Sequence, residues 1–242
     1  MKNEFIIIIV EGVTDELLVG ELIEDFKERH PNVTTHIVDG DLFFRNINSN
    51  KSIKALVGDF VKQTVIPETK IKLKDISAVI QIVDIDGVYI NCNQIIINSD
   101  LTKLTYHSDK IEVCNEGEKN YILNRNKIRS RNINSVVNGK VLKDKPYKLF
   151  FHSCNLEHVL FDELNYNEEN KYDDVNAKIL TSNPEELLKL LIENSSINPD
   201  FDFNENYKNT WNEIKSNTNE ISRSNNVALM PDFLEELLKN DD

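Results

Sequence analysis

The sequence predicts an α/β fold around a mostly parallel sheet that is flanked by helices. Two apolar runs of strand length, at residues 5–10 and 78–83, have no polar face, as expected of parallel strands that are buried on both sides. A short strand is expected at 33–38, and helical periodicity fills the chain between these runs. This β-α-β-α-β alternation is typical of parallel strands joined by right-handed crossovers. With 242 residues, the chain is long enough for one large domain with an insertion or an appendage.

The two helices between these strands are predicted from their apolar faces and from the residues at their ends. Residues 14–29 begin at Thr14, a residue type that favours the N-cap position, and end before Pro31. Residues 52–65 form a second amphipathic helix, which is expected to stop before Pro67. Both helices fit the crossovers of the predicted sheet.

Beyond residue 87 the periodicity weakens, and it returns only near residue 147. The intervening chain is rich in Asn and basic residues, with short strand candidates at 94–98 and 110–113. The later elements are expected to be a core strand at 147–153 that runs into a helix, a polar loop at 165–176, a helix at 183–192, irregular chain at 199–207 and a closing helix at 231–239. The sequence therefore predicts a core of residues 1–87 and 147–242, which ends in a helical extension, and a basic insertion at 88–146.

The distribution of charge matters more than its sum. The net charge of −13 disfavours non-specific binding to nucleic acid. Between Lys119 and Lys148, however, nine basic residues stand against one acid, Asp144. Seven of them are candidates for contacts with a phosphate backbone: Arg125, Lys127, Arg129, Arg131, Lys140, Lys143 and Lys145. The alternative is a solvated face that pairs with the acidic segment 157–174.

Composition predicts a cytoplasmic protein with no membrane partner. No apolar run approaches the roughly 18 residues needed to cross a bilayer. The apolar stretch after Lys2 ends at Glu11 and lacks the cleavage site of a signal peptide. The three cysteines are odd in number and form no CxxC pair, which argues against a disulfide framework and a zinc site and favours places in the core.

Acidic residues follow two of the predicted strands. Glu11 follows the first strand, and Asp84 and Asp86 follow the strand at 78–83. In an open α/β sheet the ligand crevice lies outside the carboxyl ends of the strands, so these side chains are expected to converge. Carboxylates in one crevice repel each other unless a cation lies between them, and oxygen ligands favour Mg²⁺ or Mn²⁺. Strand-end aspartates also cap turns, which is the alternative explanation.

These motifs resemble those of the Toprim fold, which topoisomerases, primases, RNase M-five type maturases and OLD-family nucleases share. The resemblance rests on Glu11-Gly-x-Thr-Asp15 after an apolar strand and on Asp84-x-Asp86-Gly after a later one. Ser153-Cys-Asn-Leu-Glu157 also looks like the later strand-to-helix glutamate of OLD and RloB-like Toprim proteins.

The resemblance implies roles for five acidic residues. Glu11 would be a metal ligand or a general acid or base, and Asp84 and Asp86 would be metal ligands. Asp15 matches the position that OLD nucleases use for a second metal, and Glu157 would complete that site. The acids at positions 15 and 157 also have an explanation without a metal, because acidic residues are favourable in the first turn of any helix. The basic residue that assists OLD-like catalysis has no clear counterpart in this sequence.

The activity implied by the resemblance is Mg²⁺- or Mn²⁺-dependent cleavage of phosphodiester bonds in RNA, tRNA included, or in DNA. The setting it implies is anti-phage defence, as the effector of a partner ATPase. The sequence contains no Gly-x-x-x-x-Gly-Lys-[Ser/Thr], so that ATPase would be a separate polypeptide. A homo-oligomer is compatible with the sequence. Two alternatives stay open: a catalytically silent module that binds a protein partner, and a phosphoryl or nucleotidyl transferase.

Overall fold

The computed structural model describes residues 4–31, 33–39, 42–45 and 51–239, and its chain forms two compact units. The first unit comprises Met1–Val83 and Arg131–Phe150, and the second comprises Asp84–Ser130 and Phe151–Asp242. The second unit joins the C-terminal part of the chain to the segment that begins at Asp84, and side chains from both segments share one apolar cluster.

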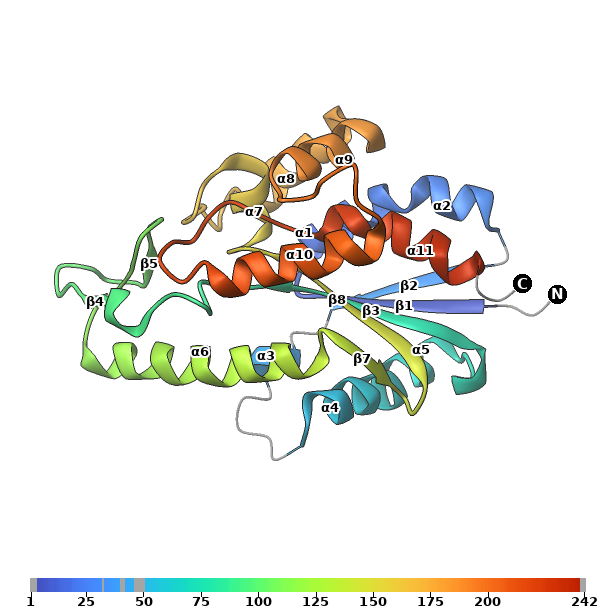
Figure 1. The fold of residues 1–242 in the computed structure, drawn as a ribbon, viewed down its shortest axis with the longest axis horizontal. Coiled ribbons are helices and arrows are strands. Elements are labelled where there is room, and N and C mark those ends of the chain that lie inside the picture. Colours follow the sequence, from blue (N-terminus) through green and yellow to red (C-terminus); the bar gives the residue numbers. More distant parts are fainter. Residues whose placement is uncertain (1–3, 32, 40–41, 46–50, 240–242) are drawn as a thin grey trace. The chain divides into compact units, whose positions relative to one another are not determined.

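The first unit is built on a five-stranded sheet with the order β2-β1-β3-β8-β7 (Figure 1). Strand β1 (Glu4–Val10) pairs in parallel with β2 (Val33–Asp39) and with β3 (Ile76–Asp84). At the other edge, β7 (Asn138–Val141) pairs antiparallel with β8 (Lys145–His152). The prediction of a mostly parallel α/β sheet is confirmed.

The central strands are buried as their sequences predict. Ile6, Ile7, Ile8 and Ile9 of β1 have no exposed surface. Burying a side chain of this size stabilises a fold by about 1.5–3 kcal/mol. Gln81 on β3 is also fully buried, and its side-chain oxygen accepts a hydrogen bond of 2.8 Å from the Tyr147 hydroxyl.

Helices cover this sheet, with two differences from the prediction. The helix expected at 14–29 is two helices, α1 (Val13–Leu22) and α2 (Glu24–Arg29). The helix expected to stop before Pro67 continues from α4 (Ile53–Phe60) through the π-helical turn η1 (Val61–Val65) into α5 (Ile66–Thr69). Proline is tolerated in the first turn of a helix, and α5 ends at Thr69 because the next residue, Lys70, is left-handed with φ of 59°. A four-residue helix, α3 (Leu42–Arg45), and the 3₁₀ turn η2 (Leu73–Asp75) complete these connections.

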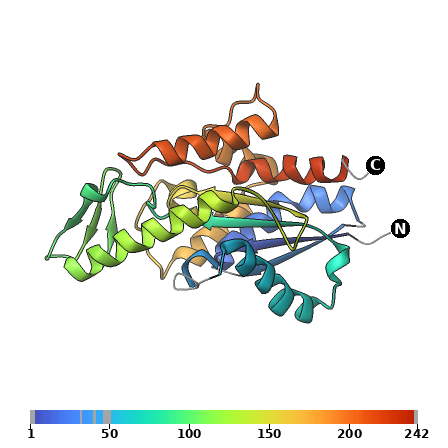
Figure 2. The same cartoon turned by 60° about the horizontal axis from the view of Figure 1, so that its bottom comes forward.

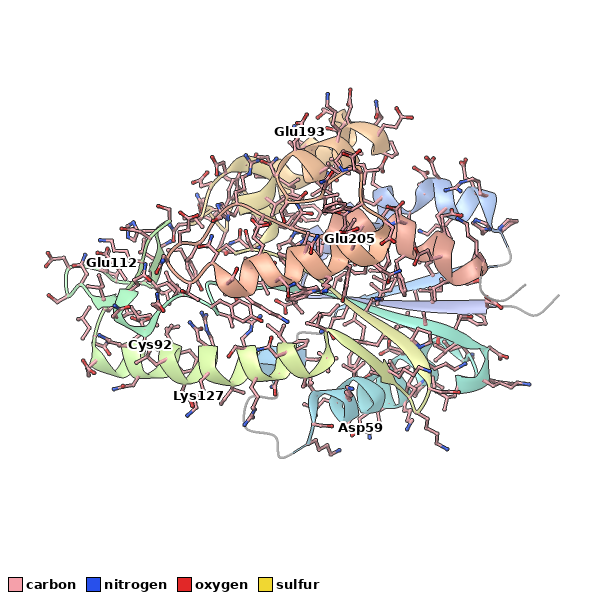
Figure 3. All side chains as sticks on the ribbon, viewed as in Figure 1. Asp59, Cys92, Glu112, Lys127, Glu193 and Glu205 are labelled. Carbon is pink, nitrogen blue, oxygen red and sulfur yellow. The ribbon has the colours of Figure 1, made fainter. Side chains whose placement is uncertain are left out.

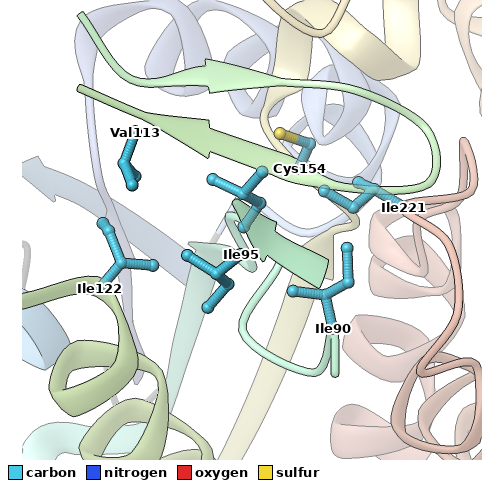
Figure 4. Packing of buried hydrophobic residues seen from close by; sticks show 7 residues of the cluster. Ile90, Ile95, Val113, Ile122, Cys154 and Ile221 are labelled. Atoms are coloured by element: carbon cyan, nitrogen blue, oxygen red, sulfur yellow. The ribbon is translucent and has the colours of Figure 1, made fainter. Parts of the chain in front are cut away.

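The second unit contains a small three-stranded sheet with the order β4-β6-β5. Its strands are β4 (Ile95–Ile97), β5 (Thr105–Tyr106) and β6 (Ile111–Val113), and the turn η3 (Cys92–Gln94) precedes β4. Figure 2 shows these strands beside the start of the long helix α6 (Glu116–Val136). The buried cluster in Figure 4 joins the sheet to later segments through Ile90, Ile95, Ile111, Val113, Ile122, Cys154 and Ile221.

The sequence pattern misses three helices of this chain. Helix α6 has no predicted counterpart, α8 (Lys171–Thr181) begins inside the expected loop, and α10 (Phe203–Ser216) begins inside the expected irregular segment. Helix α6 lacks an apolar stripe because several of its buried side chains are polar. The remaining elements are α7 (Leu156–Phe161), α9 (Pro184–Glu193), η4 (Val227–Leu229) and α11 (Met230–Lys239).

Within the described parts of the chain, no helix is both long enough and apolar enough to cross a bilayer. The three cysteines are free thiols. Cys154 is buried, as expected of a core residue, whereas Cys92 is exposed and Cys114 is partly exposed.

Candidate functional site

The acidic turn that follows β3, residues 84–87, has an unusual backbone. Asp86 and Gly87 both adopt left-handed conformations, with φ of 53° and 64°. A Cβ atom at Gly87 would lie 2.9 Å from side-chain carbons of Ile111 and of Ile221, so a larger residue would have to displace both. These two left-handed residues form the turn that carries both Asp84 and Asp86.

Backbone hydrogen bonds hold the acidic turn against the end of β8 and the segment that follows it. The Ile85 amide donates to the His152 carbonyl at 2.9 Å, and the Asp86 amide donates to the Cys154 carbonyl at 3.1 Å. All of these residues belong to the second unit. The acidic turn is thereby connected directly to the chain that leads into α7.

Arg129 of helix α6 binds the acidic turn with two nitrogens. Its Nη1 donates to Asp86 Oδ2 at 2.9 Å, and its Nη2 donates to the Asp84 carbonyl at 2.6 Å. The Arg129 side chain is 2% exposed, whereas that of Asp86 is 25% exposed. The guanidinium is therefore an internal partner of the turn, while the Asp86 carboxylate remains accessible from solvent.

Two further residues of α6 extend this contact. Arg125 Nη2 donates to the Asp86 carbonyl at 2.8 Å, and Asn126 Nδ2 donates to the Gly87 carbonyl at 3.2 Å. Arg125 also donates to the side chain of Asn126 and to the Tyr106 hydroxyl. Both α6 residues are buried. One face of α6, with Arg129 included, thus donates to four acceptors of the turn: the carbonyls of Asp84, Asp86 and Gly87 and the carboxylate of Asp86.

Glu157 lies in the first turn of α7. The Asn155 side chain caps this helix by accepting the His158 amide at 2.8 Å. Glu157 is 1% exposed, and its Oε2 lies 3.2 Å from the Lys171 ammonium at the start of α8. Burial alone would lower the pKa of Lys171, but the nearby carboxylates of Glu157 and Asp84 outweigh it and raise that pKa. Lys171 is therefore a cation that contacts Glu157 and is also stabilised by the charge of Asp84.

The Cys154 thiol identifies the acids that lie close together. Its pKa is well above the ordinary value, first because the thiol is buried and then because the carboxylates of Asp86, Asp84 and Glu157 disfavour a thiolate. The Arg125 guanidinium acts in the opposite direction. Three of the five predicted acidic residues, all in the second unit, thus act electrostatically on the same buried thiol.

The other two predicted acids, Glu11 and Asp15, belong to the first unit. Glu11 follows β1, and Asp15 is buried in the first turn of α1. Gly12 separates Glu11 from the helix in an extended conformation, with φ of −162°, that any residue can adopt. The site roles predicted for Glu11 and Asp15 stay predictions.

The chemistry of the converging donors fits a divalent cation, since Asp84, Asp86 and Glu157 offer oxygen atoms alone. Their arrangement is not that of a formed metal site. Among the described residues, no group of three or more His, Cys, Asp or Glu side chains is placed to hold a metal ion. Instead, Asp86 contacts Arg129 and Glu157 contacts Lys171.

The predicted basic residues divide by burial. Arg125 and Arg129 are buried partners of the acidic turn, whereas Lys127 is exposed on α6, where Figure 3 shows it on the outer side of the helix. The remaining candidates belong to the first unit: Arg131, Lys140 and Lys143 are exposed, and Lys145 is half-buried.

Sequence reasoning missed Lys171 as a member of the site. A signal was available, because Lys171 is the one basic residue in the acidic segment 157–174. The positions of Asn126 and Tyr106 beside the acidic turn had no signal that a single sequence reveals. A scan against protein-family models and searches of curated proteins and of solved structures find no match to this chain.

Proposed function

We propose that this protein is a metal-dependent nuclease that cleaves phosphodiester bonds in RNA, tRNA included, or in DNA. The observation that carries the proposal is the grouping of three acids in the second unit: Arg129 holds Asp84 and Asp86 in one turn, and Glu157 contacts Lys171, whose pKa the Asp84 carboxylate also raises. Mg²⁺ and Mn²⁺ prefer such oxygen donors. A cation bound there would lower the pKa of a water molecule and stabilise charge on a phosphoryl group in the transition state.

The chain's own cations have two different roles in this proposal. Arg125 and Arg129 are buried and keep the acidic turn in place. Lys171 is 29% exposed beside Glu157, so a phosphate group of the substrate can reach its ammonium. Lys171 then neutralises part of the charge of the phosphodiester, and it is our candidate for the basic residue that assists OLD-like catalysis. The exposed Lys127 contacts the nucleic-acid backbone.

The test is cleavage of plasmid, single-stranded DNA and total tRNA by the purified protein with Mg²⁺, Mn²⁺ or EDTA. We expect cutting with a divalent cation, and we expect Asp84→Asn and Glu157→Gln to reduce it to the level seen with EDTA. Glu193→Gln is the matched control, because Glu193 is an exposed acid on α9 whose partner is Lys189. Metal-dependent cutting that survives both site variants would contradict the proposal.

The resemblance to Toprim proteins extends the proposal in two directions. Glu11 and Asp15 are proposed to take part in catalysis or metal binding, which Glu11→Ala and Asp15→Ala test in the same assay. The protein is also proposed to be a cytoplasmic effector of anti-phage defence that a separate ATPase controls. If the purified chain binds Mn²⁺ but does not cut, addition of that partner is expected to release the activity.

A second candidate function is a catalytically silent module that binds a protein partner. It is favoured by the ion pairs of Asp86 with Arg129 and of Glu157 with Lys171, which already neutralise two of the three converging acids. Under this alternative, titration with Mn²⁺ gives no heat of binding, and Asp84→Asn leaves every activity of the protein unchanged. The two functions are therefore separated by a binding measurement that needs no substrate.

A further inference from the structure

The turn between β7 and β8 contains two left-handed residues, neither of which is glycine. Leu142 has φ of 53° and Lys143 has φ of 82°. Residues with a Cβ adopt this conformation at an energetic cost, so contacts elsewhere in the fold must offset it. Leu142 is 7% exposed, whereas Lys143 is exposed. The turn is therefore anchored by one residue and presents the next one to solvent.

The anchor lies on helix α4, which packs against β7 within the first unit (Figure 1). A Cβ at Gly58 of α4 would lie 3.5 Å from Leu142 Cδ2, an ordinary van der Waals distance, and Gly58 is buried. A Cβ at Gly139 of β7 would lie 3.1 Å from the Lys54 ammonium. The hairpin of β7 and β8 therefore meets one side of α4 at two points.

This side of α4 carries exposed lysines. Lys54, Gly58 and Lys62 follow one another at intervals of four residues, so they lie along one side of the helix over about 12 Å. Lys54 and Lys62 are exposed. The one acid of this segment, Asp59, accepts a hydrogen bond of 2.6 Å from Lys51, which is the main reason that its pKa is lowered, and the charge of Lys62 contributes less.

The hairpin adds two lysines to the same side. Lys145 lies opposite Val141, and strand alternation directs both toward α4, as it does position 139. Lys143 is exposed in the turn between them, and Lys140 alternates to the other side of the strand. The sequence of the hairpin contains one acid, Asp144. Four lysines on this side thus outnumber the acids around them.

Such a row of cations matches the charge of a nucleic-acid backbone. A duplex carries one negative charge per about 1.7 Å of its axis, so about 12 Å of α4 faces about seven phosphates. Lysine ammonium groups bind phosphates as point charges, whatever the base sequence. Because the chain as a whole carries a charge of −13, it repels nucleic acid except where cations are concentrated.

We infer that Lys54, Lys62, Lys143 and Lys145, here called the lysine face, bind the phosphate backbone of a nucleic acid. The choice of partner rests on the proposed function, which the inference deepens by giving the substrate a contact surface in the first unit. The strained turn between β7 and β8 holds Lys143 in this surface.

The experiment is filter binding of total tRNA and of a short DNA duplex to the full chain in EDTA, over a range of salt concentrations. EDTA separates binding from metal-dependent cleavage. We expect the double variant Lys54→Ala and Lys143→Ala to bind more weakly, with the slope of log K against log salt reduced by about 1.4–1.8. Lys62→Ala replaces it if circular dichroism shows that the double variant is unfolded, with an expected reduction of about 0.7–0.9.

The control is the double variant Lys27→Ala and Lys189→Ala, which removes the same charge. Lys27 is exposed on α2, which packs on β2 at the opposite edge of the sheet from β7. Lys189 is exposed on α9. We expect the control to keep the wild-type slope, and a loss confined to the lysine-face variant supports the inference.

Three results would overturn the inference: no binding of either nucleic acid by the wild type, equal slopes in the two double variants, or displacement of tRNA by poly-glutamate as effectively as by unlabelled tRNA. The last result would indicate an acidic protein partner. The proposed function is decided separately, because Asp84→Asn is expected to lose cutting and to keep binding in EDTA, whereas the lysine-face variant is expected to lose binding.

Discussion

Gly87 is the residue of the acidic site with the least freedom to change. Its φ of 64° is unfavourable for other residue types, and a Cβ would approach Ile111 and Ile221 to 2.9 Å. We expect Gly87→Ala to lower the free energy of unfolding by about 1–3 kcal/mol, because the strain of the backbone adds to the clash. Urea denaturation measures this change directly.

Gly20 is the control for this substitution. It lies inside helix α1, and a Cβ there would meet no atom within 4 Å. Gly20→Ala is expected to raise the free energy of unfolding by about 0.5–1 kcal/mol, since alanine is the better helix former. If Gly87→Ala left the free energy of unfolding unchanged, or raised it as Gly20→Ala is expected to do, the acidic turn would tolerate other conformations.

His158 makes the stability of the protein depend on pH. Burial is the main reason that its pKa falls from 6.5 to about 4, and nearby Asp162 opposes this shift. Between these values the unfolded chain binds a proton that the folded protein excludes. The free energy of unfolding is therefore expected to decrease as the pH falls from about 6.5 to about 4, by on the order of 3 kcal/mol.

The contribution of His158 is obtained by difference. The free energy of unfolding of the wild type and of His158→Gln is measured by urea denaturation at pH 7, 6 and 5. The carboxylates titrate in both proteins, so the difference between the two pH profiles gives the contribution of His158. We expect the variant to lose less stability over this range than the wild type. Parallel pH profiles would mean that the imidazole reaches solvent in the folded state.

At the scale of elements, helix α6 has faces with different chemistry. Arg125, Asn126 and Arg129 face the acidic turn, while Lys127 is exposed. If the exposed face contacts nucleic acid, Lys127→Ala is expected to weaken tRNA binding and to reduce the slope of log K against log salt by about 1. Filter binding over a range of salt concentrations measures this slope.

Lys189→Ala is the control for the α6 substitution. Lys189 is an exposed lysine on α9 that pairs with Glu193 at 3.8 Å. Its loss removes the same charge from the chain at a different place. Equal slopes for the two variants would indicate that the protein responds to net charge and that α6 has no special contact with the nucleic acid.

The elements also show which kinds of pattern a single sequence reveals. The isoleucines of β1 predict a buried strand because all of them are apolar and all are buried. Helix α6 escapes the same reasoning, because its buried face includes two arginines and an asparagine that are satisfied by backbone carbonyls far away in the sequence. Helix α10 carries the apolar residues Phe203, Tyr207, Trp211 and Ile214 at helical spacing, and the sequence analysis did not use that signal.

A single sequence likewise reveals only part of the candidate site. Acids at strand ends are expected at the carboxyl edge of a sheet, since strand direction and sheet topology position them, and the meeting of Glu11 with Asp84 and Asp86 stays a prediction. The cations that neutralise them come from α6 and α8, whose places are set by packing. From its charge, Arg129 was expected to contact nucleic acid at the surface. Its burial follows from the packing of α6, which a single sequence does not reveal.

At the scale of the whole molecule, the acids that converge in the second unit make that unit the one expected to respond to metal. Trp211, the single tryptophan of the chain, lies buried in the same unit against Phe151. Mg²⁺ at 100 times its dissociation constant would stabilise the folded state by about 2.7 kcal/mol. We therefore expect Mg²⁺ to raise the unfolding temperature followed by tryptophan fluorescence.

Asp84→Asn tests this expectation. The substitution removes a converging carboxylate and leaves the surroundings of Trp211 unchanged. We expect the variant to unfold at the same temperature with Mg²⁺ as with EDTA. A Mg²⁺ effect of equal size in wild type and variant would place the cation elsewhere on this acidic chain.

The environment of Cys154 gives the protein a selective thiol chemistry. Alkylating and oxidising reagents attack the thiolate, and burial together with three carboxylates keeps Cys154 protonated. Cys92 is exposed in the turn before β4. A maleimide dye or a nitroxide will therefore attach at the accessible thiols, the exposed Cys92 before the partly exposed Cys114, and leave Cys154 unmodified, so the native chain can be labelled without altering its acidic centre.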